Sequence, residues 1–163
     1  MNRFRATSCL ALTALALMFL SPQVLAGEQV PFKGSLQGDV VHTPVAPTID
    51  AVSITGTGQA THLGEYTVTV PHLVDRTARS AEGTYEFTAA NGDILRAYFV
   101  GHATPTATAG VLSVVEIATI TGGTGRFAGA TGEFTTVRIY DSIAGTTTGS
   151  FEGTISSPGA SKH

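Results

Sequence analysis

The sequence predicts an all-β fold: an antiparallel barrel of about eight strands that is closed or nearly closed. Threonine, valine, isoleucine, glycine and aromatic residues dominate, and apolar residues at helical spacing are missing. About eight runs of strand character lie between Phe32 and Ser156, with turn signals between them. Because short links make neighbouring strands antiparallel, eight strands in succession favour closure, which leaves no exposed edge.

Alternation and turn residues place the individual strands. Tyr85 and Phe87 oppose polar neighbours on the other face, which is typical of a strand with one buried side. Asn91-Gly92 predicts a two-residue turn with positive φ at both positions, residues 61–64 predict another tight hairpin, and residues 56–58 indicate a bulge. The expected strands are 32–41, 49–60, 65–74, 82–90, 93–102, 111–120, 133–141 and 146–156.

The N-terminus predicts a secretory signal peptide at residues 1–26. Arg3 and Arg5 give a basic start, the apolar run at 10–20 is too short to span a bilayer of ~30 Å, and small residues follow where a peptidase cuts. A retained anchor helix is the alternative. We therefore expect a secreted protein, extracellular or periplasmic, with one β-barrel domain at 27–156 and a flexible tail at 157–163.

The composition of the mature chain excludes several functions. It would have about 137 residues and no cysteine, since Cys9 lies in the leader, so disulfides and thiolate chemistry are excluded. Without Arg3 and Arg5 it has seven basic and 12 acidic residues, a net charge of −5. Such scattered negative charge argues against nucleic acid, and no later segment predicts a membrane span.

The glycine-rich stretch at 120–132, I-T-G-G-T-G-R-F-A-G-A-T-G, predicts a wide β-connection whose backbone needs conformations that glycine tolerates. It is no phosphate-binding loop, because Arg126-Phe127 stands where such a loop needs lysine and a hydroxyl residue. We expect Phe127 to plug one end of the barrel.

This stretch resembles the glycine-rich signature of the allene oxide cyclase and dirigent barrel superfamily. Val30-Pro31-Phe32 is similar to the start of the first barrel strand in the cyclases, and Asn91-Gly92 followed by Asp93-Ile94-Leu95 falls where the family has its central hairpin. The resemblance implies a secreted member of bacterial type, a barrel that uses no cofactor, and a homo-oligomer, dimer or trimer.

The family's chemistry does not carry over. The cyclases have an asparagine two residues after the phenylalanine, where this chain has Gly34. Their essential glutamate lies on a strand earlier than the expected mature chain, and their barrel cysteine has no counterpart. The resemblance thus implies a barrel with a ligand-sized mouth and no specific reaction.

Glu116 is the candidate catalytic residue, because a carboxylate among apolar strand residues can serve as a general acid or base. It can equally pair with Arg96 or Arg138, or face solvent or a subunit seam. Its strand, 111–120, is apolar on both faces otherwise, which favours subunit contact outside the barrel.

Further candidates bind a ligand. Arg96 with Tyr98, and Arg138 with Tyr140, repeat a cation and a phenol on one face of a strand. If that face is inner, it makes a polar pocket for a carboxylate or phenolic ligand; if outer, it is a solvated face. His62 lies in a tight turn three residues before Glu65, and both are ligand-binding candidates at a barrel rim. The histidine spacing predicts no metal site.

Three functions stay open. The first is a barrel that binds a small, partly apolar organic ligand. The second is a cofactor-free cyclase or isomerase in which Glu116 or Arg96 manages charge. The third is a structural or interaction barrel packed solid with side chains. An empty interior with some polar side chains favours the first two functions. A filled interior, with apolar residues on the outer faces of the strands, favours the third.

Overall fold

The computed structural model describes residues 27–156. The signal peptide predicted at 1–26 and the tail predicted at 157–163 lie outside these residues. None of the helices in the described part is long and apolar enough to cross a membrane.

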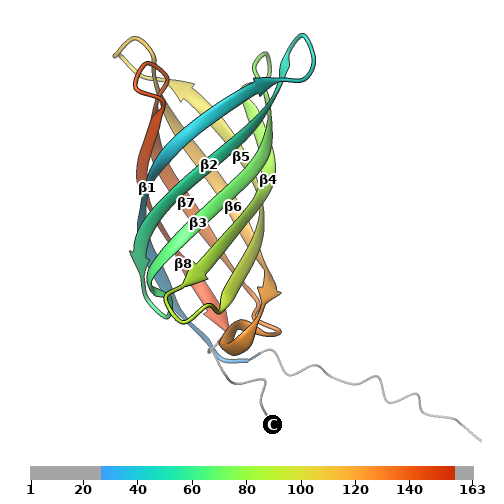
Figure 1. Cartoon of the computed structure of the whole chain (residues 1–163), viewed down its shortest axis with the longest axis vertical. Helices are drawn as coiled ribbons and strands as arrows, with labels where there is room; N and C mark the ends of the chain where they lie inside the picture. Colours follow the sequence, from blue (N-terminus) through green and yellow to red (C-terminus); the bar gives the residue numbers. More distant parts are fainter. Residues whose placement is uncertain (1–26, 157–163) are drawn as a thin grey trace, which may run out of the picture.

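Eight antiparallel strands form a closed barrel in which each strand pairs with its sequence neighbours and β1 pairs with β8 (Figure 1). The predicted all-β barrel is confirmed, and every predicted strand agrees with an observed one to within a few residues. The strands are β1 (Gln29–Pro44), β2 (Ile49–Ala60), β3 (Gly64–Asp75), β4 (Ser80–Ala89), β5 (Ile94–Pro105), β6 (Val111–Gly123), β7 (Gly132–Asp141) and β8 (Thr146–Ser156).

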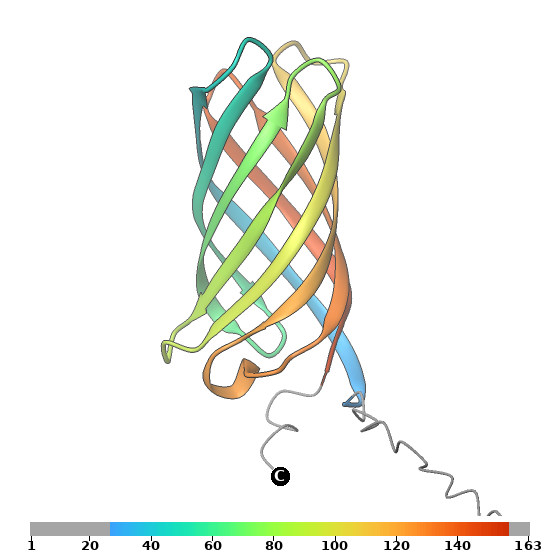
Figure 2. The ribbon, with the colours of Figure 1, turned by 90° about the vertical axis from the view of Figure 1, so that its right-hand side faces the viewer.

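Four loops, at 45–48, 76–79, 106–110 and 142–145, surround the upper end of the barrel in Figure 2. The lower end has the turns at 61–63 and 90–93 and the glycine-rich connection between β6 and β7. The start of β1 and the end of β8 also lie there. The upper end therefore has four short connections, and the lower end has two short connections and the glycine-rich connection between β6 and β7.

Aromatic side chains fill the lower half of the barrel. Phe32 packs on Phe151 with ring centroids 4.9 Å apart, and Phe87 stacks on Tyr85 at 5.3 Å. Further ring pairs join Tyr66, Phe99 and Phe134 to the same cluster. Each ring buries a large apolar area, so this cluster is the main hydrophobic contribution to stability.

The glycine-rich connection closes the lower end as predicted. Gly122, Gly125, Gly129 and Gly132 have positive φ, and the pairing of β5 with β6 shifts register opposite Arg96 and Ala97. The chain then makes a single 3-10 turn, η1 (Gly125–Phe127), which places Phe127 in the core with no exposed surface. The prediction that Phe127 plugs the barrel is confirmed.

Two local predictions are wrong. The hairpin between β4 and β5 is not a two-residue turn: Gly92 has φ 86° but Asn91 does not have positive φ, and Gly92 N–H donates to the Ala89 carbonyl. This is a longer loop, in which an ordinary turn is followed by glycine in the left-handed region. The bulge expected at residues 56–58 is also absent, because β2 keeps a regular register with both neighbours.

Candidate functional site

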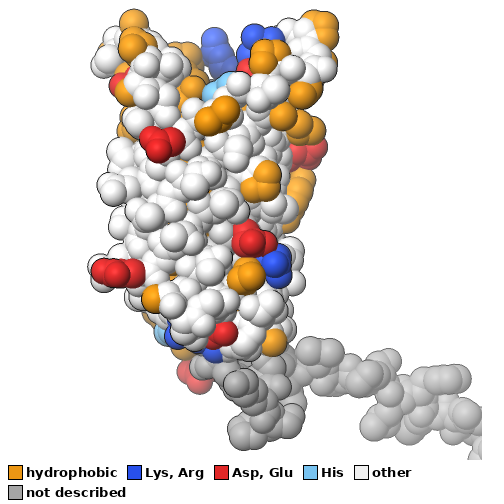
Figure 3. All heavy atoms as spheres, viewed as in Figure 1, with side chains coloured by type: hydrophobic (Ala, Val, Ile, Leu, Met, Phe, Trp, Pro, Cys, Tyr) orange, Lys and Arg blue, Asp and Glu red, His pale blue; other side chains and the backbone are white. Residues whose placement is uncertain are grey.

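A small cavity of about 70 Å³ lies inside the upper mouth of the barrel. Seven of its fourteen lining residues are aliphatic, and the other seven are polar residues from β1, β3, β4, β5, β7 and the 76–79 loop. Figure 3 shows basic and histidine side chains gathered between the upper loops. The lining residues are Val40, His42, Val52, His72, Val74, Arg79, Ser80, Ala81, His102, Ala103, Leu112, Val114, Arg138 and Tyr140.

Arg138 on β7 stands between this cavity and a carboxylate below it. Its Nη2 lies 2.6 Å from Oε1 of Glu116 on β6, and its Nε lies 3.2 Å from both carboxylate oxygens. Nη1 donates to the Thr147 hydroxyl at 3.2 Å. Glu116 has no exposed surface and does not line the cavity. The carboxylate is therefore sealed beneath the arginine.

Tyr85 completes this buried cluster from β4. Its hydroxyl donates to Glu116 and lies 3.3 Å from the Thr136 hydroxyl. Burial raises the pKa of Tyr85, and the neighbouring Glu116 charge raises it further. Burial alone would lower the pKa of Arg138, but the charge of Glu116 and its hydrogen bonds outweigh this and raise it. The cluster thus keeps a protonated phenol and a charged arginine around the carboxylate.

His72 on β3 supplies the other buried polar group of the mouth. Its Nδ1 lies 2.8 Å from the Val70 carbonyl, so Nδ1 carries the proton and Nε2 presents a lone pair. Burial lowers the pKa of His72, and its ring packs edge-on against Phe99. His72 is accordingly a neutral hydrogen-bond acceptor near pH 7.

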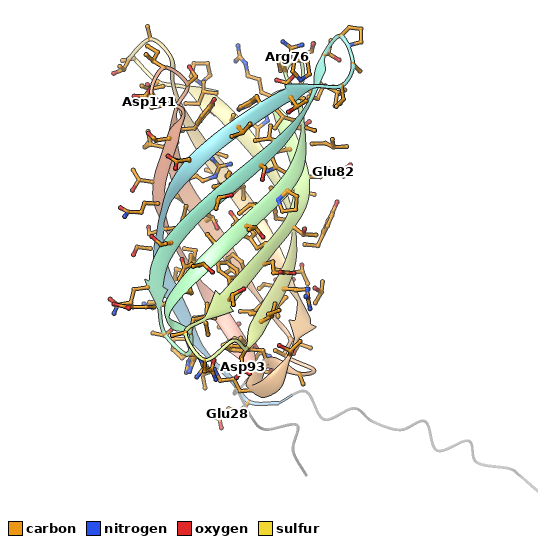
Figure 4. The ribbon with its side chains drawn as sticks, in the orientation of Figure 1. Glu28, Arg76, Glu82, Asp93 and Asp141 are labelled. Atoms are coloured by element: carbon orange, nitrogen blue, oxygen red, sulfur yellow. The ribbon has the colours of Figure 1, made fainter. Side chains whose placement is uncertain are left out.

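An ion pair, hydrogen bonds and ring stacking hold the rim of the mouth together. His42 stacks on Tyr140 with centroids 5.4 Å apart, and its Nδ1 lies 3.3 Å from Asp50 Oδ2. Arg76, labelled at the upper end in Figure 4, places Nε 3.4 Å from Asp50 Oδ1 and donates from Nη2 to the Pro47 carbonyl at 2.7 Å. These contacts link the 45–48 loop to the 76–79 loop.

The two Arg-x-Tyr pairs point in opposite directions. Arg138 and Tyr140 face inward and line the cavity. Arg96 and Tyr98 face outward, where Arg96 Nε is 2.9 Å from Glu86 and the Tyr98 hydroxyl is 3.0 Å from Glu82. The inner alternative therefore holds for β7, and the outer, solvated alternative holds for β5. Arg96 therefore cannot stabilise charge on a substrate inside the barrel.

His62 and Glu65 lie at the other end of the molecule. His62 occupies the β2–β3 turn with φ 65°, and its Nε2 is 3.2 Å from the Pro31 carbonyl. Glu65 is exposed on the outer face of β3. Neither residue meets the mouth or Glu116.

Sequence reasoning missed His72, His42 and Asp50. The alternation of inward and outward residues along their strands carried the signal: His72 continues the inward row of Val68 and Val70. A polar residue in an apolar row marks a buried polar group, but the pattern alone does not say which groups it meets. Within residues 27–156 no three acidic or histidine side chains cluster as metal ligands would.

Gly34 shows why the asparagine of the cyclases has no place here. A Cβ at this position would lie 2.4 Å from Phe151 Cζ and 2.6 Å from the Ala60 Cβ. The aromatic cluster occupies the volume that a longer side chain would need.

No protein-family model and no curated protein sequence matches this chain. Among solved structures, a pterocarpan synthase dirigent protein matches with a TM-score of 0.55 and 14% sequence identity, over 87% of this chain and 98% of that one. At this identity the likeness concerns the fold. The chain has a dirigent-like, eight-stranded β-barrel.

Proposed function

We propose that the protein binds one end of a small, partly apolar organic ligand in the upper mouth of the barrel. The observation that carries the proposal is the cavity of about 70 Å³, in which seven aliphatic residues lie beside polar residues that include His72, Arg138 and Tyr140. Small-molecule sites combine an apolar lining with a few placed polar groups in this way. The dirigent-like barrel is a fold that suits a ligand at its mouth.

The size of the cavity limits what enters it. A pocket that encloses a whole drug-sized ligand measures roughly 300–1,000 Å³, so this cavity takes only a ring or a short branched chain. The rest of the ligand would lie among the four upper loops. The aromatic cluster excludes it from the lower half of the barrel.

The buried polar groups of the cavity, His72 and Arg138, indicate a neutral ligand end, whereas Arg79 is exposed at the rim. The guanidinium of Arg138 already donates to Glu116 and Thr147, so little of its charge is left for a ligand carboxylate. His72 offers the lone pair of Nε2, and the Tyr140 hydroxyl can donate or accept. A hydroxyl group on an apolar ring or chain satisfies both.

The proposal is tested by filling the cavity. Ala103 lines it and Thr104, its neighbour on β5, points outward, so Ala103→Leu and Thr104→Leu are a matched pair. A panel of small alcohols and phenols is screened by the rise in melting temperature and by native mass spectrometry. Stabilisation that is lost in Ala103→Leu and kept in Thr104→Leu supports the proposal. Equal binding by both variants, or no stabilisation by any compound, would overturn it.

A cofactor-free cyclase or isomerase is the second candidate, with Glu116 as its acid or base. Glu116 lies behind Arg138, so a substrate in the cavity would reach the carboxylate only if the arginine moved. Glu116→Gln tests this function: lost turnover with unchanged ligand affinity supports it, and no turnover in either protein ends it.

A homo-oligomer is the third proposal, and the outer face of β5, β6 and β7 supports it. Val100 lies opposite Ile117, and Val115 lies opposite Val137, with each side chain between 44% and 59% exposed. Adjacent exposed aliphatic residues of this kind mark interaction surfaces. A second copy of the chain would cover them.

Size-exclusion chromatography with light scattering should show an oligomer. Ile117→Lys should dissociate this oligomer, and Thr69→Lys, on another face, should not. A monomer at every concentration would contradict the proposal.

Secretion is the remaining proposal. It is supported by the basic start and apolar run of residues 1–20. N-terminal sequencing of exported protein should begin near Gly27, and retention of residues 1–26 would contradict it.

A further inference from the structure

A second concave site lies on the outside of the barrel, away from the mouth. It is a trough of about 700 Å³ across β1, β2, β3 and β4, with one residue of β8. It is lined by Ser35, Leu36, Gln37, Thr57, Gly58, Gln59, Glu65, Tyr66, Thr67, Thr88, Ala89, Ala90 and Thr148. Neither the mouth nor the oligomer face uses these residues.

The strand register explains the shape of the trough. Its upper wall is one unbroken row of outward side chains in which each residue is paired with the next: Thr148, Gln37, Thr57, Thr67 and Thr88. Its lower wall is the next outward row, in which Ser35 pairs with Gln59 and Gln59 pairs with Glu65.

The floor is backbone. Leu36, Gly58 and Tyr66 are paired across the strands between the two walls, and their side chain positions face inward. The trough therefore runs across the strands, with side chains rising on both sides. Five strands spaced ~4.8 Å apart give it a length of about 19 Å.

The chemistry of the walls is hydroxyl and amide. Serine and threonine hydroxyls both donate and accept, and a glutamine amide offers two donors and an acceptor. Glu65 is the single charged side chain among the lining residues. Figure 3 shows the face over β1 to β4 mostly in the white of uncharged polar side chains and backbone, with few charged or apolar groups.

We propose that this trough binds a neutral polyhydroxylated chain, an oligosaccharide or polysaccharide. The interval between neighbouring strands is close to the length of one hexose residue in an extended chain. A chain laid across the strands would thus meet one hydroxyl or amide of the upper wall per sugar. The Glu65 carboxylate would accept hydrogen bonds from ligand hydroxyls and repel anionic polymers.

The length of the ligand gives the first test. Binding of cello-oligosaccharides, from the disaccharide to the hexasaccharide, is measured by isothermal titration calorimetry and by NMR chemical-shift mapping. Affinity should rise with length and level off near the pentasaccharide, as five strand positions fill. Oligogalacturonides of equal length, which carry carboxylates, should bind more weakly.

A matched pair of double variants gives the second test. Thr57→Val with Thr67→Val removes two hydroxyls from the upper wall at constant shape, and should weaken binding about tenfold. Thr119→Val with Thr135→Val makes the same change on the outer faces of β6 and β7 and should leave binding unchanged. Shift mapping on the unmodified protein reports the site even if the first variant fails to fold. Any one of four results would overturn the proposal. These are no binding of any neutral oligosaccharide, chemical shifts confined to the mouth, tighter binding of the anionic series, and equal affinity of the two double variants.

Discussion

Arg138 and Glu116 form a buried ion pair at the centre of the barrel, with Nη2 and Oε1 2.6 Å apart and side chains 5% and 0% exposed. The pair lies at the boundary between two halves of the interior. Below it the aromatic rings pack together, and above it the mouth opens to the loops. Every nitrogen of the guanidinium is bonded to Glu116 or Thr147, which makes the pair part of the structural core as well as the floor of the cavity.

Replacing Glu116 by glutamine should destabilise the protein strongly. The change leaves the Arg138 charge buried without its counter-ion, which costs roughly 3–5 kcal/mol in comparable sites. Urea unfolding followed by circular dichroism measures the loss. The control is Lys33→Gln, which breaks the exposed ion pair with Glu152 and should cost about 1 kcal/mol or less. Equal losses in the two variants would contradict the structural role of the pair.

Gly34→Asn should also destabilise, because the new side chain meets Phe151 and Ala60 in the packed lower half. Overpacking of this kind costs roughly 1–3 kcal/mol or prevents folding. Ser35→Asn, one residue along on the outer face, serves as the control and should change the melting temperature little. A Gly34→Asn protein as stable as the control would show that the lower half has room for a side chain.

Stability should fall as the pH drops below about 6.5, in part because of His72. Burial lowers the pKa of His72 from its ordinary value of 6.5, so the unfolded chain binds a proton at pH values where the folded protein does not. The contribution is fully present above pH 6.5 and is lost as the pH falls toward the lowered folded pKa. Melting temperatures between pH 5 and 7 should vary less in His72→Gln than in the unmodified protein. His102→Gln, at an exposed histidine, should keep the original pH dependence.

The buried tyrosines should resist ionisation. Burial raises the pKa of Tyr66 and of Tyr85, so both phenols stay protonated in the folded barrel beyond pH 10, whereas the unfolded chain loses their protons near that value. Stability should accordingly decrease as the pH rises above 10. Phenolate absorbance in an alkaline titration should show these two tyrosines ionising only together with unfolding. Their titration in a protein that keeps its native circular dichroism would contradict the burial.

Local signals in the sequence determined most of the fold. Alternation of apolar and polar residues gave strands that match the observed ones closely, because half-buried strands need that period. The glycine-rich stretch likewise predicted the β6–β7 connection and the Phe127 plug, since few other residues tolerate its backbone. Closure followed from eight short-linked strands.

Only the tertiary structure decided which side chains meet inside. On β7 the apolar residues Val137 and Ile139 face outward while Arg138 faces inward, against the usual preference for burying aliphatic groups. The reason lies on another strand: Glu116 compensates the arginine charge. The sequence of β7 alone does not predict this pairing. On β5 the same Arg-x-Tyr motif points outward, because Leu95, Ala97 and Phe99 fill the interior there. The orientation of Arg138 depends on its partner on the neighbouring strand, and the register of β6 with β7 fixes that partner.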